Sequence, residues 1–170
     1  MIAIGIDPGQ LGGIAVIYPT ADFGTQAIAI PMPKTERDIW LALRGYRDIG
    51  SCTAIIELVH AMPRQGVSSS FKFGCNYGFL RACLTAADIP FSEATPRTWM
   101  KGLGARTRKK AESKTQWKHY LRGLAQQRFP QLKVTLKTAD ALLIAWYAWR
   151  EHNGQPTEGH QRDLASQPGR

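Results

Sequence analysis

The sequence has few cysteines and no long apolar segment, and both absences restrict the class of protein. Its three cysteines, Cys52, Cys75 and Cys83, are an odd number without Cys-x-x-Cys spacing, which argues against a disulfide framework and against a zinc site. No stretch approaches the roughly 18 apolar residues of a membrane span, and the first residues lack the pattern of a secretion signal. We therefore expect a cytoplasmic protein with reduced thiols and no membrane partner.

Acidic residues are almost missing from one part of the chain. Between Arg97 and Lys137 there are 12 lysines and arginines and one acid, Glu112, so this basic segment carries a charge of +11. The ten cations and 12 acids elsewhere sum to −2. A local excess of this kind is typical of a surface that binds a polyanion, because solubilising charge is usually spread through a chain. Nucleic acid is the favoured partner, and a solvated helix face is the alternative.

The apolar pattern predicts alternating strands and helices in a chain of 170 residues, long enough for one domain. Short runs rich in β-branched residues predict strands at 2–6, 13–18, 25–30, 53–57 and 89–94. Helical spacing and capping residues predict helices at 35–48, 71–87, from 95, at 113–129 and at 139–151. Residues 152–170 have no apolar period and are rich in Gly, Pro and Gln. We expect a disordered tail there, behind a single domain of residues 1–151.

Three carboxylates stand in apolar surroundings. Asp7 ends the first strand, Glu57 ends the strand at 53–57, and Asp140 opens the apolar last helix. An ionised carboxylate among apolar residues is unfavourable unless it is paired or binds a metal, and carboxylate oxygens suit Mg²⁺ or Mn²⁺. Two such ions can activate water and stabilise the leaving oxygen when a phosphodiester is cut. Each acid also has an ordinary alternative: a turn residue, a solvated strand end and a helix-dipole acid, respectively.

The order of these motifs resembles a known family. A first strand ending in GIDPG, a later strand ending in IIE and a last helix opening with ADALLIA are similar to the RuvC-type Holliday-junction resolvases of the RNase H-like nuclease superfamily. The segment VHAMPRQGVSSSFKFGCNYG is similar to the branch that phages and some bacteria carry, which implies a bacterial or phage-encoded protein. The likeness covers residues 1–150.

The resemblance implies an α/β, RNase H-like fold: a mixed five-stranded sheet whose first three strands are antiparallel, with helices on both faces. It implies an Mg²⁺-dependent endonuclease that acts as a homodimer and makes paired cuts in four-way and related branched DNA junctions. Two Mg²⁺ ions, with Mn²⁺ as a substitute, are expected on Asp7, Glu57 and Asp140. Lys114, at the start of its helix, is expected to be a catalytic lysine that stabilises charge on the phosphate.

Basic and polar residues near these acids are expected to contact DNA. The loop expected at 60–70 follows Glu57 and would read the substrate, and the basic segment would bind the backbone. Phe71 and Phe73 are expected to anchor the helix that follows this loop in the core, with a role as base wedges as the alternative. The expected DNA-binding residues are Arg64, Gln65, Ser68, Ser69, Lys72, Arg97, Lys101, Arg106, Arg108, Lys109, Lys110, Lys114 and Lys137.

One position departs from the family pattern. RuvC-type proteins usually have an acid or a histidine three or four residues before the last helical acid, where this sequence has Lys137 and Leu136. This departure has three alternative explanations: three carboxylates with phosphate and water suffice for both ions, the second ion binds weakly, or Lys137 neutralises the phosphate. The sequence leaves these options open.

Three other functions are compatible with the motifs. One is a related nuclease that cuts RNA–DNA hybrids or flaps, and another is a catalytically inactive junction-binding protein. The third is a sugar-kinase or actin-like ATPase, since residues 7–13 also match D-x-G-x-x-G-G, but such an ATPase needs two lobes and this chain has room for one.

Overall fold

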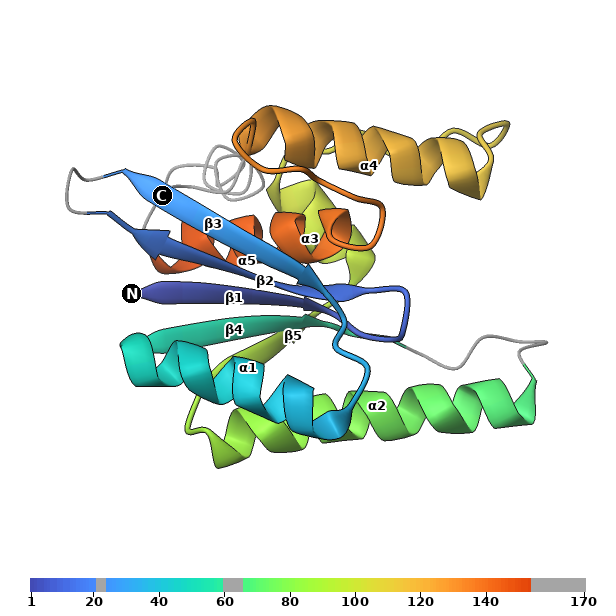
Figure 1. Ribbon diagram of the computed structural model, residues 1–170. Helices are drawn as coiled ribbons and strands as arrows, with labels where there is room; N and C mark the ends of the chain where they lie inside the picture. Colours follow the sequence, from blue (N-terminus) through green and yellow to red (C-terminus); the bar gives the residue numbers. More distant parts are fainter. Residues whose placement is uncertain (21–23, 60–65, 154–170) are drawn as a thin grey trace, which may run out of the picture.

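A mixed five-stranded sheet forms the centre of the computed structural model, which describes residues 1–20, 24–59 and 66–153 (Figure 1). The strand order is β3-β2-β1-β4-β5. β2 pairs antiparallel with β1 and β3, whereas β4 pairs parallel with β1 and β5. The predicted architecture is therefore confirmed. The strands are β1 (Ile2–Asp7), β2 (Gly13–Pro19), β3 (Thr25–Pro31), β4 (Cys52–Glu57) and β5 (Phe91–Ala94).

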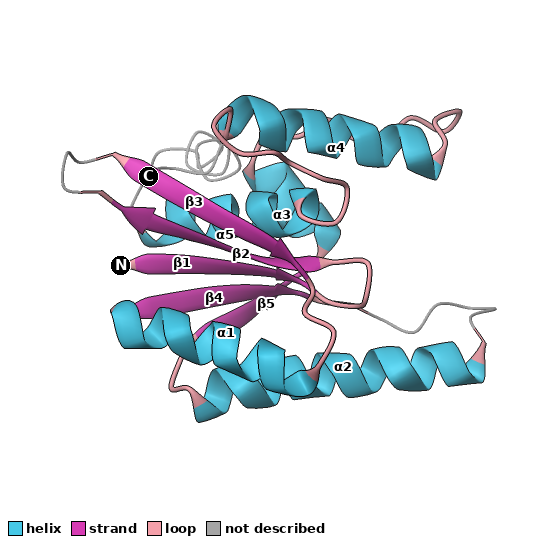
Figure 2. Cartoon of the chain, viewed as in Figure 1, coloured by secondary structure: helices cyan, strands magenta, loops and turns pink. Residues whose placement is uncertain are grey.

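Helices cover both faces of the sheet, as the cartoon coloured by secondary structure shows (Figure 2). The helices α1 (Glu36–Ile49) and α2 (Val67–Ala86) lie on one face. On the other face α5 (Ala139–His152) packs directly on the strands, and α3 (Pro96–Gly102) and α4 (Lys114–Arg128) pack on α5. Among the described residues, no helix combines the length and apolar character that a membrane crossing requires.

The sheet separates two apolar cores, and the alternation along β1 shows which residues face each core. Ile4 and Ile6 belong to the core beneath α1 and α2. Ala3 belongs to the core beneath α5. Because successive side chains of a strand point to opposite faces, Asp7 faces the same side as Ala3, toward α5.

Gly5 allows α5 to lie directly against β1. A Cβ atom at this position would overlap the backbone of Ala141 and Ala145 in α5, so no larger residue fits. Gly12, the residue before β2, lies close to Asp7. A Cβ atom at Gly12 would stand 2.9 Å from the Asp7 carboxyl carbon. The two glycines thus bring the end of β1, the start of β2 and the first turn of α5 together.

Two predicted boundaries and one core assignment are wrong. α2 begins at Val67, within the stretch expected to be a loop, because the unfavourable helix propensities of three consecutive serines are small beside the gain from extending a 20-residue helix. β5 begins two residues later than predicted. Phe71 is 72% exposed rather than a core anchor, since the first turns of α2 project past the sheet (Figure 1). The predicted tail lies outside the described residues from residue 154 onward.

Candidate active site

Asp7 and Glu57 stand side by side at one edge of the sheet. β1 and β4 are parallel neighbours, and Ile6 pairs with Ile56, so each acid is the residue that follows a paired position. Both side chains consequently point to the same face of the sheet, toward α5. Their backbone is held by the central strands of the sheet, which gives the two carboxylates fixed positions.

Asp140 lies in the first turn of α5 and is only 5% exposed. Its Oδ2 accepts a 2.6 Å hydrogen bond from the Lys118 ammonium of α4, which forms an ion pair with it. Its Oδ1 is buried and has no hydrogen-bond partner within the described parts of the chain. A buried carboxylate oxygen without a partner is unfavourable, so this atom is available for a cation or another donor.

The three carboxylates act on one another electrostatically, as expected of groups that share one site. Burial, together with the charge of Asp140, raises the pKa of Asp7 to about 7 although Lys118 lowers it. Burial and the charges of Asp7 and Asp140 raise the pKa of Glu57 to about 8, again against the effect of Lys118. Burial lowers the pKa of Lys118, but its three carboxylate neighbours outweigh that effect and raise it. With all three acids ionised, the site has an excess of negative charge that one ammonium only partly balances, and this excess is unfavourable without a further cation.

The donor chemistry of this cluster fits a divalent cation. Three carboxylates, one with a buried oxygen that has no partner, offer hard oxygen ligands of the kind that Mg²⁺ and Mn²⁺ prefer. Within the described ranges, however, no three His, Cys, Asp or Glu side chains are placed as a ready-made metal site. Mutual repulsion acts against close approach of the carboxylates, and Lys118 engages one oxygen of Asp140.

Two solved structures from Thermus thermophilus have a fold similar to that of this chain. The RuvC structure from this organism aligns with a TM-score of 0.56 at 17% identity, over 92% of this chain and 99% of that one. The chain has the RuvC fold. A second structure, T. thermophilus RuvC in complex with Holliday junction substrate, aligns with a TM-score of 0.58 at 18% identity and the same coverage. No family model and no curated protein matches the sequence, so the likeness to RuvC rests on structure.

The lysine that contacts Asp140 in this RuvC fold is Lys118, which the motifs did not single out. Lys114, the predicted catalytic lysine, is the exposed first residue of α4, one turn before Lys118. Its catalytic role stays a prediction. The spacing of four residues between the two lysines was a sequence signal that they share one side of α4. Only the packing of α4 on α5 shows which of them reaches Asp140.

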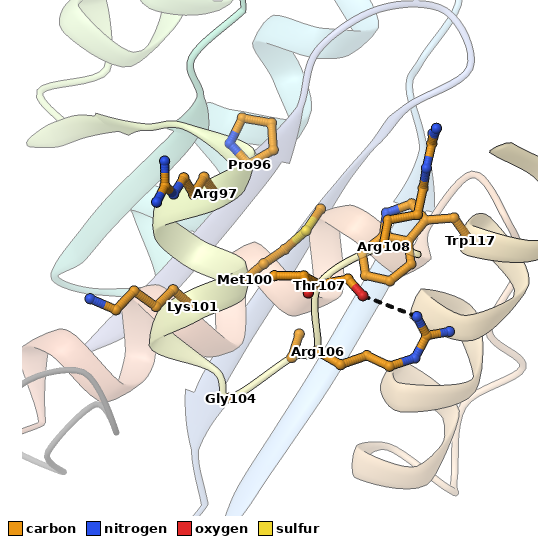
Figure 3. Close-up of a pocket in the computed structure, with 10 residues that line it drawn as sticks. Pro96, Arg97, Met100, Lys101, Gly104, Arg106, Thr107, Arg108 and Trp117 are labelled. Atoms are coloured by element: carbon orange, nitrogen blue, oxygen red, sulfur yellow. Dashed lines mark hydrogen bonds between the residues drawn. The ribbon is translucent and has the colours of Figure 1, made fainter. Parts of the chain in front are cut away.

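Four of the expected DNA-binding residues line a groove between α3 and the loop before α4, which we call the α3–α4 groove (Figure 3). Its volume is about 680 Å³, and Trp117 forms part of its wall. In Figure 3 the cations on α3 and those on the loop stand on opposite sides of the groove. These four residues are Arg97, Lys101, Arg106 and Arg108.

Arg106 is an exposed residue whose side chain is held against the protein surface. Its guanidinium binds both carboxylate oxygens of Glu112, at 2.7 and 2.9 Å, and donates to the carbonyl of Thr107. It also lies over the rings of Tyr120 and Trp117, 4.1 and 5.2 Å from their centroids. Arg106 therefore fastens the basic loop to α4.

A second groove of about 680 Å³ lies beside the turn that follows Asp7, and we call it the α2 groove. Ser69 and Lys72 from α2 and Lys137 from the segment before α5 line it. The turn itself is held by α2, since the Gly9 N–H donates to Asn76 Oδ1 at 3.0 Å. Seven of the expected DNA-binding residues therefore line one of these two grooves.

The remaining expected residues lie elsewhere. Ser68, Lys109 and Lys110 are exposed and lie outside the residues that line the two grooves. Arg64 and Gln65 lie outside the described residues, so their roles stay predictions.

Proposed function

We propose that this chain is a metal-dependent endonuclease that resolves four-way (Holliday) and related branched DNA junctions. The observation that carries the proposal is the convergence of Asp7, Glu57 and Asp140 at one edge of a RuvC fold. The complex of T. thermophilus RuvC with Holliday junction substrate supports the choice of substrate. The basic segment supplies the charge that a DNA partner requires.

In this proposal Asp7, Glu57 and Oδ1 of Asp140 hold Mg²⁺, with Mn²⁺ as a substitute. The bound ion supplies an activated water and stabilises negative charge at the scissile phosphate. The strands β1 and β4 fix two of the carboxylates, and Lys118 orients the third through its bond to Oδ2. Lys114 balances charge on the phosphate, and the cations of the two grooves hold the DNA backbone on either side of the cut.

A homodimer completes the proposed function, because a four-way junction with two-fold symmetry is best matched by a two-fold symmetric protein. The first turns of α2 carry exposed apolar side chains that suit an interface. Val67 is 87% exposed and Phe71 is 72% exposed. Burial of such side chains against a second copy would contribute favourably to association.

Competition between substrates tests the proposed function. With Mg²⁺ present, we expect cleavage of a labelled four-way junction to resist a tenfold excess of unlabelled linear duplex, RNA–DNA hybrid or flap. Preferential cleavage of the hybrid or flap would indicate a nuclease of the same fold with a different substrate. Tight junction binding without Mg²⁺-dependent products would indicate a junction-binding protein without catalytic activity.

A further inference from the structure

Lys118 occupies one side of the most buried acid in the carboxylate cluster. Its ammonium lies 2.6 Å from Asp140 Oδ2, while Oδ1 of the same carboxylate stays buried without a partner. The two oxygens of Asp140 thus differ: one is already bound by a cation that belongs to the chain, and the other is available.

The net charge of the carboxylate cluster also indicates room for only one more cation. Once all three carboxylates are ionised, as binding of a metal ion requires, they and one ammonium have a formal charge of −2, which one divalent ion neutralises. A second divalent ion would need further anionic ligands. The position three residues before Asp140 carries the exposed Lys137, and within the described ranges no additional His, Cys, Asp or Glu completes a metal site with these acids.

We propose that the Lys118 ammonium takes the place of a second cation at this site, so that the three carboxylates bind a single divalent ion. The inference rests on the proposed metal-dependent function and specifies its metal content. Lys118 is a positioning residue here: it fixes Asp140 so that Oδ1 faces the ion, and it excludes another ion from Oδ2 by charge repulsion.

The test counts bound Mn²⁺ in the full-length protein. Electron paramagnetic resonance measures the free ion during titration at pH 8 in low salt, for wild type, Lys118→Met, Lys118→Arg and Arg122→Met. Arg122 is an exposed cation one turn further along α4, so its replacement removes the same charge from the same helix. Circular dichroism checks that each variant is folded. Cleavage of a four-way junction against Mg²⁺ concentration supplies a second readout.

The proposal predicts one Mn²⁺ per wild-type chain and about tenfold tighter binding, or a second bound ion, in Lys118→Met, because a competing charge has been removed. Lys118→Arg and Arg122→Met should bind Mn²⁺ as wild type does. Cleavage should depend on Mg²⁺ with a Hill coefficient near 1 in wild type. Two ions per wild-type chain, or equal effects of Lys118→Met and Arg122→Met, would overturn the inference without affecting the proposed function. Failure of wild type and all three variants to bind Mn²⁺ or to cleave would overturn both.

Discussion

The carboxylate cluster and the basic segment carry opposite charges and are built in different ways. The acids stand on the central strands β1 and β4 and on the buried start of α5, where the backbone cannot move without disturbing both cores. Most of the cations stand on short α3, on the surface of α4 and on the loop between them. In the proposed function, chemistry that needs fixed ligands thus uses the core, and binding of a long flexible polyanion uses the surface.

Not every cation of the basic segment is free to bind a partner molecule. Of the 12 cations in the basic segment, Arg106 is bound to Glu112, Lys118 to Asp140, and Arg128 lies 3.7 Å from the centroid of the Trp146 ring. These three contribute to packing and to the active site. Variants that alter one of these regions and leave the other intact separate their contributions.

Asp7→Asn should separate cleavage from binding. The substitution keeps the shape of the side chain but removes a charged ligand, so we expect the single-turnover rate of junction cleavage to fall by about a thousandfold or more. Junction affinity in the presence of EDTA should stay within about twofold of wild type. Cleavage at the wild-type rate would exclude Asp7 from the metal site.

The cluster should also make stability depend on pH when no divalent ion is present. Glu57 and Asp7 have pKa values of about 8 and about 7 in the folded protein, against ordinary values of 4.5 and 3.8. The folded state therefore binds protons more tightly than the unfolded state, and the free energy of unfolding should fall as pH rises from about 4 to about 8. Urea unfolding in EDTA measures this slope.

Glu57→Gln sharpens that measurement because it removes one titrating group. At pH 8 in EDTA, we expect the free energy of unfolding to rise by about 1–3 kcal/mol relative to wild type, and the pH slope to become smaller. The matched control is Glu151→Gln, which removes an exposed acid near the end of α5. Equal slopes in wild type and Glu57→Gln would mean that Glu57 is not held in a repulsive cluster.

The basic segment can be tested by neutralising Arg108, Lys109 and Lys110 to glutamine. At about 0.1 M salt we expect roughly tenfold weaker junction binding, and a slope of log affinity against log salt that is smaller by about 2 to 3. The cleavage rate at saturating protein should be unchanged. A control that neutralises Arg37, Arg44 and Arg47 removes the same charge from α1 on the opposite face of the sheet. An equal loss in this control would show that only net charge matters.

The Glu112→Gln variant tests whether Glu112 holds the basic loop in place or acts only as a negative charge near DNA. If Glu112 acts only as a negative charge near DNA, its removal should strengthen junction binding. If it holds the basic loop by accepting bonds from Arg106 and from the Lys109 N–H, its removal should weaken binding. We expect weaker binding, by about two- to fivefold. Fluorescence anisotropy with a labelled junction measures the difference.

Much of this fold was predictable from local patterns. Strand and helix periodicity, the Thr35, Thr95 and Ser113 caps, and the apolar strands that end at Asp7 and Glu57 all identify elements that the structure confirms. Prediction failed at the start of α2, because a run of serines has weak helix propensity and the effect that offsets it is not local.

The carboxylates were predictable because each one interrupts an apolar pattern. Lys118 was not, since it is one of several lysines on an exposed helix and its importance depends on how α4 packs against α5. The same holds for Arg106, whose partner Glu112 is the single acid of the basic segment. Contacts between elements, rather than motifs, decide which cations are engaged within the protein and which are left for the proposed DNA partner.

The most direct test of the central claim is a time course on a synthetic four-way junction with each strand labelled in turn. With Mg²⁺, wild-type protein should produce paired nicks at symmetric positions in two opposed strands, and EDTA should abolish them while leaving the complex intact. Junction binding without nicks in Mg²⁺ or Mn²⁺, or nicks that persist in EDTA, would contradict the account of a metal-dependent active site at Asp7, Glu57 and Asp140.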